Sequence, residues 1–286
     1  MSMEAGRVGF IGLGNIGLPM ALTLLRSGRE VWVHDVRPDA VQSCVEAGAR
    51  AATPREMAAG CDLVGIAVLS DAQVTDVVTG LLTGVDSTGP VVVVHSTILP
   101  ATVTELDART AEVGVGLVDA PVSGGDMGAR AGTLTVMAGG RPEHLERCRP
   151  YFTAIGERVE AVGGVGSGAA AKLALQLMTY CNQLAALESV RLADAYGIEE
   201  SAFVDLATET TGDSWIIRNW GFFDRLMRDH RLAGTDEMYQ TYGKDLYDVV
   251  VAAREAGVSL PVAGVSAQEV APSFRARYEA LTSPDR

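Results

Sequence analysis

The first forty residues contain the feature that most restricts the fold. A short apolar run at 7–11 has the composition of a buried strand, and the glycine-rich segment GLGNIG at 12–17 follows it directly. Apolar residues then recur at helical spacing as far as a stop at 27–28. In a G-x-G-x-x-G between strand and helix, the glycines allow a tight turn, a close approach to a pyrophosphate and close helix packing. The sequence therefore predicts a dinucleotide-binding loop formed by Gly12, Gly14, Asn15, Ile16 and Gly17.

A second predicted strand, 30–34, ends at Asp35. An acidic side chain at this point of a dinucleotide fold accepts hydrogen bonds from the ribose hydroxyls and repels a 2′-phosphate, so Asp35 favours NAD. Arg37 lies two residues further on, and an arginine there can accommodate a 2′-phosphate, which leaves NADP as the alternative. The other interpretation of Asp35 is a helix or turn cap ahead of Pro38.

The alternation of strands and helices continues along the chain. The pattern predicts helices over 41–47, 54–59, 72–82 and 100–112, and strands over 63–69, 91–94, 116–118 and 133–138. We expect the glycine-rich stretch 139–168 to hold the last strands and a hinge. Such alternation indicates an α/β fold with a doubly wound parallel sheet, whose ligands bind at the carboxyl ends of strands.

Ser123, Gly124 and Gly125 follow one of these strand ends. They place one hydroxyl next to two unshielded backbone amides, an arrangement that forms a nest for a carboxylate. The alternative is a plain glycine-rich turn, which this composition also favours.

The segment 163–196 predicts one long helix, because it contains no proline and no glycine after Gly168. At 1.5 Å per residue it spans about 40 Å, which suits an interdomain helix. It would divide the chain into a dinucleotide-binding domain, 1–164, and a second domain, 165–286. Lys172 is the one charged residue between Gly163 and Glu188. Partial desolvation would lower the pKa of this lysine towards the range of a general base, whereas a snorkelling side chain would reach solvent.

Composition excludes several classes of function. A net charge of −13, a pI near 4.7 and no basic run argue against nucleic acid and anionic membranes as partners. The four cysteines are isolated and lack metal-ligand spacing, so we expect no metal site. The N-terminus lacks a signal-peptide pattern, and the apolar runs are too short to span a bilayer. We expect a cytoplasmic protein.

Four segments together resemble the β-hydroxyacid dehydrogenase family: GFIGLGNIGLPMA at 9–21, DAPVSGGDMGARAGTLTVMAGG at 119–140, GSGAAAK at 166–172 and KDL at 244–246. The family includes 3-hydroxyisobutyrate dehydrogenase and tartronate semialdehyde reductase. The resemblance implies a Rossmann-type domain followed by an all-helical domain. It also implies an NAD(P)-dependent oxidoreductase that interconverts a small β-hydroxy acid and its semialdehyde or keto form by hydride transfer.

The resemblance also implies roles for individual residues. Lys172 would be the catalytic general acid and base, and Ser123, Gly124 and Gly125 would bind the substrate carboxylate. Thr97, with Leu69 and Ser70, would line the nicotinamide side of the cofactor site. Lys244 would reach the cofactor or the substrate from the helical domain. A homodimer or homotetramer would form through that domain.

Three departures from the family pattern leave the substrate open. Gln176 stands where the family has asparagine, and its amide either donates to a substrate hydroxyl or carboxylate or packs as an ordinary surface glutamine. The segment 236–239 replaces a phenylalanine-rich one, and 271–286 lacks the family's glycine-rich, acidic tail. The aromatic segment 212–230 predicts helical core, with Trp215 or Arg218 closing the substrate pocket as the sharper hypothesis.

Two other functions are weighed against this one. Imine reductases use NADPH on the same architecture, but they usually carry aspartate or tyrosine at the position of Lys172. A noncatalytic dinucleotide-binding protein would have lost the lysine or broken the Ser-Gly-Gly sequence, and this chain retains both.

Overall fold

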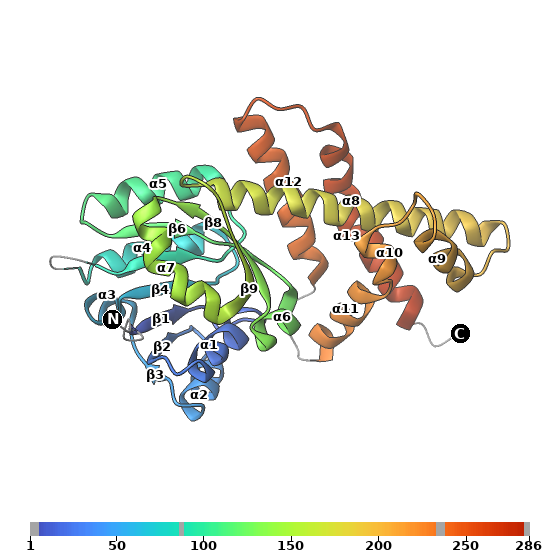
Figure 1. Ribbon diagram of the computed structural model, residues 1–286. Coiled ribbons are helices and arrows are strands. Elements are labelled where there is room, and N and C mark those ends of the chain that lie inside the picture. The colour runs from blue at the N-terminus through green and yellow to red at the C-terminus, as the bar shows by residue number, and fades with distance from the viewer. Residues whose placement is uncertain (1–5, 86–88, 233–237, 283–286) are drawn as a thin grey trace. The chain divides into compact units, whose positions relative to one another are not determined.

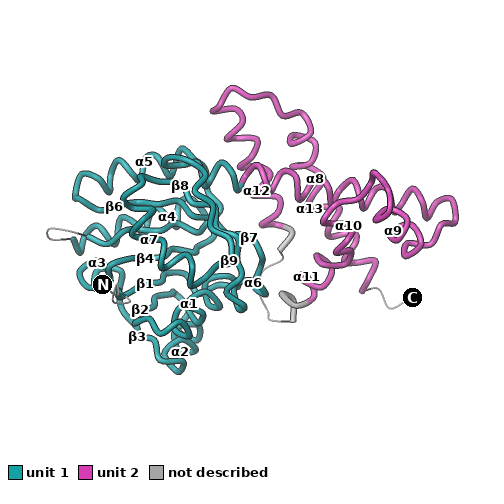
Figure 2. The backbone as a smooth tube through the Cα atoms, in the orientation of Figure 1, with its two compact units in different colours: residues 1–172 teal, residues 173–286 magenta. Residues whose placement is uncertain are grey.

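The protein is described here by a computed structural model that covers residues 6–85, 89–232 and 238–282. The chain divides into two compact units, residues 1–172 and 173–286, which Figure 2 colours separately. They meet eight residues beyond the predicted domain boundary at 164/165. Along the described residues, no helix combines the length and the apolar character needed to cross a membrane.

The first unit is built on one sheet, and Figure 1 labels its strands except β5 and β7. They are β1 (Val8–Ile11), β2 (Val31–His34), β3 (Arg50–Ala51), β4 (Leu63–Ile66), β5 (Val91–Val94), β6 (Gly116–Asp119), β7 (Val122–Ser123), β8 (Leu134–Gly140) and β9 (Gly156–Gly163). Their order is β3-β2-β1-β4-β5-β6-β8-β7, and β9 pairs with β8. The strands from β3 to β6 are parallel, whereas β8 runs antiparallel to β6 and β7. The predicted Rossmann-type sheet is confirmed, with an antiparallel addition at its far side.

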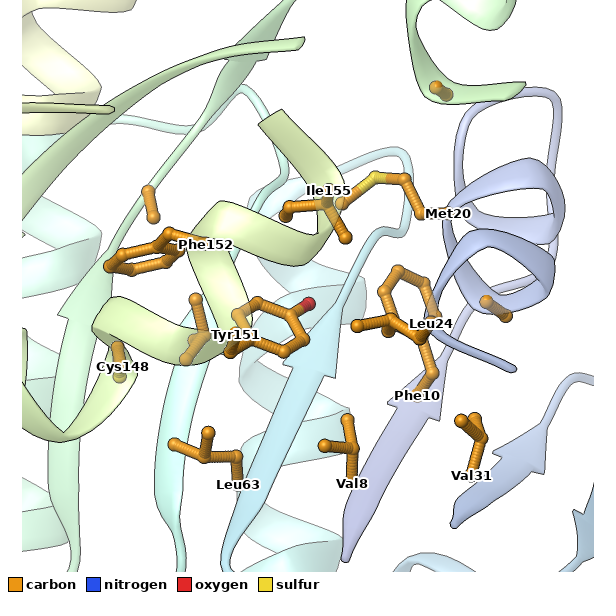
Figure 3. Close-up of a cluster of buried hydrophobic side chains, with 14 of the residues drawn as sticks. Val8, Phe10, Met20, Leu24, Val31, Leu63, Cys148, Tyr151, Phe152 and Ile155 are labelled. Carbon is orange, nitrogen blue, oxygen red and sulfur yellow. The ribbon is translucent and has the colours of Figure 1, made fainter. Parts of the chain in front are cut away.

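Helices cover both faces of this sheet, because its central strands are apolar on both sides. In β5, Val91 and Val93 belong to one buried cluster, and Val92 and Val94 belong to another. The first cluster packs under α1 (Gly17–Arg26), α2 (Pro38–Glu46) and α7 (Pro142–Ile155), as Figure 3 shows for α1 and α7. The second packs under α3 (Pro54–Gly60), α4 (Asp71–Leu82) and α5 (Pro100–Ala111). The sheet is therefore doubly wound.

Helix α7 corrects the interpretation of 139–168 as strands and a hinge. Its buried residues Cys148, Tyr151, Phe152 and Ile155 are spaced three, one and three apart, which is one face of a helix. The glycines that suggested a hinge lie on either side of this helix and not within it. The stretch does contribute one strand, β9, after the helix ends.

The described residues of the second unit form helices joined by short turns, without a strand, as predicted. Helix α8 (Ser167–Ala195) begins in the first unit and continues into the second as one helix of 29 residues. It is followed by α9 (Glu200–Thr208), α10 (Trp215–Arg218), α11 (Phe222–Leu232), α12 (Met238–Glu255) and α13 (Pro261–Thr282). Residues 236–237 of the segment that replaces the family's phenylalanine-rich one lie outside the described residues, as do the side chains of 238–239.

An aromatic cluster forms the centre of the second unit. The ring of Phe274 lies 4.9 Å from that of Tyr242 and 5.2 Å from that of Phe223. The ring of Tyr180, from α8, packs against those of Tyr242 and Phe223. This confirms helical core for part of the aromatic segment. Trp215 is 52% exposed and rests edge-on against Phe222.

Arg277 of α13 ties three helices together. Its guanidinium forms two hydrogen bonds of 2.6 Å to Glu200 of α9 and one of 3.0 Å to Asp224 of α11. Trp220 donates to the same Glu200 carboxylate at 2.7 Å, and the guanidinium lies 5.3 Å from its ring centre. A bidentate, partly buried pair of this kind is among the stronger electrostatic contacts in proteins.

We therefore expect Arg277→Met to destabilise the helical unit by about 2–4 kcal/mol, because it removes the charge-assisted hydrogen bonds to two partly buried carboxylates. Urea unfolding followed by circular dichroism would measure the loss. Arg254→Met is the matched control, since Arg254 is exposed near the end of α12. Equal unfolding midpoints for the two variants would contradict the assignment.

Candidate functional site

The loop between β1 and α1 has the geometry that a bound dinucleotide requires. Gly12 adopts a φ of +91°, and a Cβ there would lie 2.4 Å from the carbonyl oxygen of Ala67. A Cβ on Gly17 would lie 1.8 Å from the carbonyl oxygen of Gly12. A Cβ on Gly14 would meet nothing within 4 Å. Packing thus explains Gly12 and Gly17, whereas Gly14 leaves its backbone open to a ligand.

Asp35, directly after β2, is tied to this loop. Its Oδ2 accepts a hydrogen bond from the Leu13 amide at 2.5 Å, and its Oδ1 accepts one from the Arg37 amide at 2.8 Å. The second contact is the turn cap of the alternative interpretation, and it coexists with the first. The Arg37 guanidinium donates to the Leu13 carbonyl at 2.7 Å and lies 3.4 Å from Asp35 Oδ1. Oδ1 thus accepts from both the amide and the Nε of Arg37, whereas Oδ2 retains a lone pair for a ribose hydroxyl.

The neighbouring strand ends lie on the same edge of the sheet, because β1, β4 and β5 are adjacent and parallel. After β4, the Ser70 hydroxyl caps α4 by accepting from the Gln73 amide at 3.3 Å, and Leu69 is largely exposed. After β5, Thr97 is half-buried. The buried Ser96 accepts from the Val68 amide at 2.9 Å and so joins the two strand ends.

The Ser-Gly-Gly segment leads from β7 into α6 (Gly125–Ala131). Gly124 has a φ of +132° and Gly125 a φ of +64°, so two consecutive residues occupy the region that favours glycine. Ser123 and Gly124 are exposed. The segment therefore offers a hydroxyl and backbone amides without side chains to cover them, as a carboxylate nest requires.

Lys172 reaches this segment from α8. Its Nζ donates to the Val122 carbonyl oxygen at 2.9 Å, and the residue is half-buried. The amine therefore lies beside Ser123 and does not simply extend to solvent. The sequence contains two lysines, Lys172 and Lys244, and its other 21 Lys or Arg residues are arginines. That scarcity was a further sequence signal for both positions.

Gln176 and Lys244 belong to a polar network in the second unit. The Gln176 amide nitrogen donates to Asp245 at 2.6 Å and to the Tyr180 hydroxyl at 3.0 Å. The Asp245 carboxylate can only accept, so the amide nitrogen of Gln176 must be the donor in that contact. With one hydrogen directed to Asp245 and the other to Tyr180, the carbonyl oxygen of Gln176 is the group left for another ligand. Lys244 contacts Asp248 at 2.8 Å and Asp245 at 3.3 Å. Burial lowers the pKa of Lys244, but these two carboxylates outweigh it and raise the pKa above its ordinary value.

His95 supports the segment 119–125 from the buried side of the sheet. Its Nδ1 lies 2.7 Å from the Ala120 carbonyl oxygen, and its Nε2 lies 2.7 Å from the Tyr151 hydroxyl. The carbonyl can only accept, so Nδ1 carries the hydrogen and Nε2 accepts from Tyr151. Burial lowers the pKa of His95 to about 4.

His95 therefore predicts a loss of stability in acid. The neutral ring is favoured in the folded state, so its contribution is complete above the ordinary pKa of 6.5 and declines as the pH falls towards 4. We expect wild type to lose about 2–3 kcal/mol relative to His95→Gln between pH 7 and pH 4.5, because glutamine keeps a donor and an acceptor but does not titrate. Urea unfolding at both pH values measures this, and parallel changes in the two proteins would refute it.

Comparison with known proteins identifies the family. Residues 7–164 match the model of the NAD-binding domain of 6-phosphogluconate dehydrogenase. Residues 166–280 match the model described as NAD-binding of NADP-dependent 3-hydroxyisobutyrate dehydrogenase. The NAD-dependent L-serine dehydrogenase of Pseudomonas aeruginosa is 34% identical over 269 residues, which cover 91% of this chain and 89% of that protein. The 3-hydroxyisobutyrate dehydrogenase of the same organism is 34% identical over 215 residues, 73% of this chain and 72% of that protein.

A solved structure agrees with these matches. The 3-hydroxyisobutyrate dehydrogenase of Mycobacterium tuberculosis, solved with L-serine, has a TM-score of 0.83 and 25% sequence identity, and the match covers 98% of this chain and 100% of that one. The chain therefore belongs to the NAD(P)-dependent β-hydroxyacid dehydrogenase family, of the 3-hydroxyisobutyrate dehydrogenase type.

Proposed function

We propose that the protein interconverts a small β-hydroxy acid and its semialdehyde or keto form, with Lys172 as the general acid and base. The observation that carries this proposal is the 2.9 Å contact between Lys172 Nζ and the Val122 carbonyl. It sets an amine next to the exposed hydroxyl and amides of Ser123, Gly124 and Gly125. A proton-transfer group beside a carboxylate nest is the arrangement that oxidation of a hydroxy acid needs.

Each group has a defined task in this proposal. Ser123 and the amides that follow it hold the substrate carboxylate, which fixes the hydroxyl-bearing carbon within the site. The neutral amine of Lys172 takes the hydroxyl proton as the carbonyl forms. In the opposite direction the protonated amine returns that proton to the developing alkoxide. The nicotinamide cofactor supplies the hydride chemistry when bound.

NAD is the proposed cofactor. The open backbone at Gly14 and the remaining lone pair of Asp35 Oδ2 fit a dinucleotide, and the carboxylate of Asp35 disfavours a 2′-phosphate. Arg37 is held by Asp35 and by the Leu13 carbonyl, so its guanidinium is committed within the loop. NADP remains the alternative, to be decided by measurement.

Initial-rate assays of a panel of small β-hydroxy acids with NAD and with NADP test the proposal. The names of the relatives direct the panel to L-serine and 3-hydroxyisobutyrate. We expect turnover with at least one acid and faster turnover with NAD. Binding of NADH without turnover of any acid would contradict the proposed reaction.

The helical domain is the proposed surface for a homodimer or homotetramer. Large apolar side chains are exposed on its helices, among them Leu192 of α8, Leu206 of α9 and Val265 of α13. Exposed apolar residues of this size are typical of surfaces that another subunit covers. Light scattering after size exclusion would give the mass, and a 30.0 kDa species would refute the proposal.

A further inference from the structure

We propose that Asp119 is the positioning residue for Lys172: its buried carboxylate holds the first turn of α8 and so fixes where the lysine amine lies. The proposal rests on the proposed function for the role of Lys172. In this proposal Asp119 takes no part in the proton or hydride transfer. Its carboxylate instead accepts hydrogen bonds from backbone amides at the start of α8.

The contacts of Asp119 are with the start of α8. It is the last residue of β6 and is 1% exposed. Its Oδ1 accepts from the Gly166 amide at 2.9 Å, and its Oδ2 accepts from the Ala169 amide at 2.8 Å. The first amides of a helix have no acceptor within the helix. A serine at the start of a helix often accepts from these amides, but the Ser167 hydroxyl donates to the Gly164 carbonyl at 2.6 Å. The Asp119 carboxylate from β6 accepts from them instead.

The helix start is also pressed against the ends of β6 and β8. A Cβ on Gly168 would lie 2.4 Å from the Asp119 carbonyl oxygen and 2.5 Å from that of Met137. A Cβ on Gly139 would lie 2.6 Å from the Gly168 nitrogen. Side chains are therefore excluded from this contact, and the carboxylate and the glycine backbone together define the position of the first turn.

The anchor and the lysine contact share two short segments. Ala169 and Lys172 lie within one turn of α8, and Asp119 and Val122 are three residues apart in the segment that leads to Ser123. The carboxylate holds the helix to this segment, and the Val122 carbonyl receives the lysine amine. Since a helical turn is rigid, a displaced first turn would move Nζ away from the nest, and small misplacements of a catalytic group are costly.

The buried Asp119 carboxyl is harder to ionise in the folded protein than in the unfolded chain. Burial raises the pKa of Asp119 to about 6, although the amides of Ala169, Gly166 and Gly168 act in the opposite direction. Because the folded pKa exceeds the ordinary value of 3.8, the contribution of this group to stability decreases as the pH rises from about 4 to 6. The charge present at neutral pH is therefore retained at a cost, and it is this anion that binds the amides most strongly.

Asp119→Asn tests the proposal, with Asp107→Asn as the matched control. Asp107 is also buried in the first unit, but it pairs with Arg141 at 2.7 Å. Asparagine offers one acceptor and sets an amide hydrogen against a backbone donor. We expect hydrogen exchange of the peptide 164–176 to be at least tenfold faster in Asp119→Asn and unchanged in Asp107→Asn.

A second measurement follows Lys172 without using activity. Reductive methylation with ¹³C-formaldehyde labels two lysines and the N-terminal amine, so the lysine signals can be assigned with Lys172→Arg. In Asp119→Asn we expect the Lys172 signal to move and the Lys244 signal to stay. With the acid that the panel identifies, kcat should fall at least tenfold, the KM for NAD should change less than twofold, and the deuterium isotope effect on kcat should increase.

Unchanged exchange at 164–176, or an unmoved Lys172 signal, would overturn the proposal. Faster exchange throughout the first unit, with NADH binding lost, would also overturn it, because Asp119 would then be structural only. Should the asparagine variant not fold, Asp119→Ser removes volume and keeps one acceptor, and it is judged by the same criteria. If wild type turns over no acid, the proposed function fails, whereas exchange and the lysine signal still decide the anchor.

Discussion

Replacement of Lys172 by alanine should lower kcat by about 10²–10⁴-fold, the range that a general acid or base contributes. The variant loses the only amine next to the Ser-Gly-Gly segment within the described part of the first unit, since the second lysine of the chain belongs to the helical unit. NADH binding should be unchanged, because Gly12, Gly14 and Asp35 are untouched. Fluorescence titration of NADH and initial rates with the selected acid measure both quantities.

Lys172→Arg is the informative control. Arginine keeps a cation and hydrogen-bond donors near Val122, but its guanidinium does not deprotonate in the accessible pH range and cannot take the hydroxyl proton. We expect the arginine variant to be as inactive as the alanine variant, and a small primary amine added to Lys172→Ala to restore part of the rate. Substantial turnover by Lys172→Arg would mean that charge alone is needed and would reject proton transfer by Lys172.

Asp35→Asn should shift the preference between cofactors towards NADP, by about 100-fold in the ratio of the two kcat/KM values. The change removes the charge that repels a 2′-phosphate. It also weakens one of the two contacts that hold the Arg37 guanidinium, the one of 3.4 Å to Asp35 Oδ1. Hydrogen bonds to charged groups contribute about 1.5–3 kcal/mol each, so one lost with NAD and one gained with NADP, both at the lower end of that range, account for a shift of about 100-fold.

The double variant Asp35→Asn/Arg37→Ala separates these two causes. If Arg37 recognises the phosphate, the double variant should lose most of the gain with NADP while its rate with NAD stays close to that of Asp35→Asn. Arg37→Ala alone should leave the preference for NAD in place. An unchanged cofactor ratio in Asp35→Asn would show that the ribose is recognised elsewhere.

The sequence predicted best where function depends on local geometry. The tight turn at Gly12 and the close packing at Gly17 are properties of a few neighbouring residues, so the conformation of this loop could be predicted from its own sequence. At Gly124 and Gly125 the sequence predicted backbone amides that no side chain shields, and the structure adds that both residues have a positive φ. Helix α7 was missed because the glycines on either side of it suggested a hinge. Its buried face consists of few residues, and that face becomes evident only once the helix is seen packed on the sheet.

Contacts between distant segments could not be predicted in the same way. Asp119 belonged to a recognised motif, but its partners lie 47 and 50 residues away, and no periodic pattern joins them. The orientation of the Gln176 amide depends on Asp245, 69 residues further on, which decides that the amide hydrogens are already engaged. Both arrangements follow from tertiary packing that composition and spacing do not encode.

The boundary between the compact units has a consequence for exchanging parts between relatives. A chimaera joined at residue 165 would take Gly166, Ala169 and Lys172 from one parent, and Asp119 and Val122 from the other. The two halves of one anchor would then come from backbones that were selected separately. A junction beyond residue 172 keeps the carboxylate, the helix start and the lysine from a single parent. The segment that can be exchanged as one piece therefore includes the sheet and the first turns of the helix that follows it.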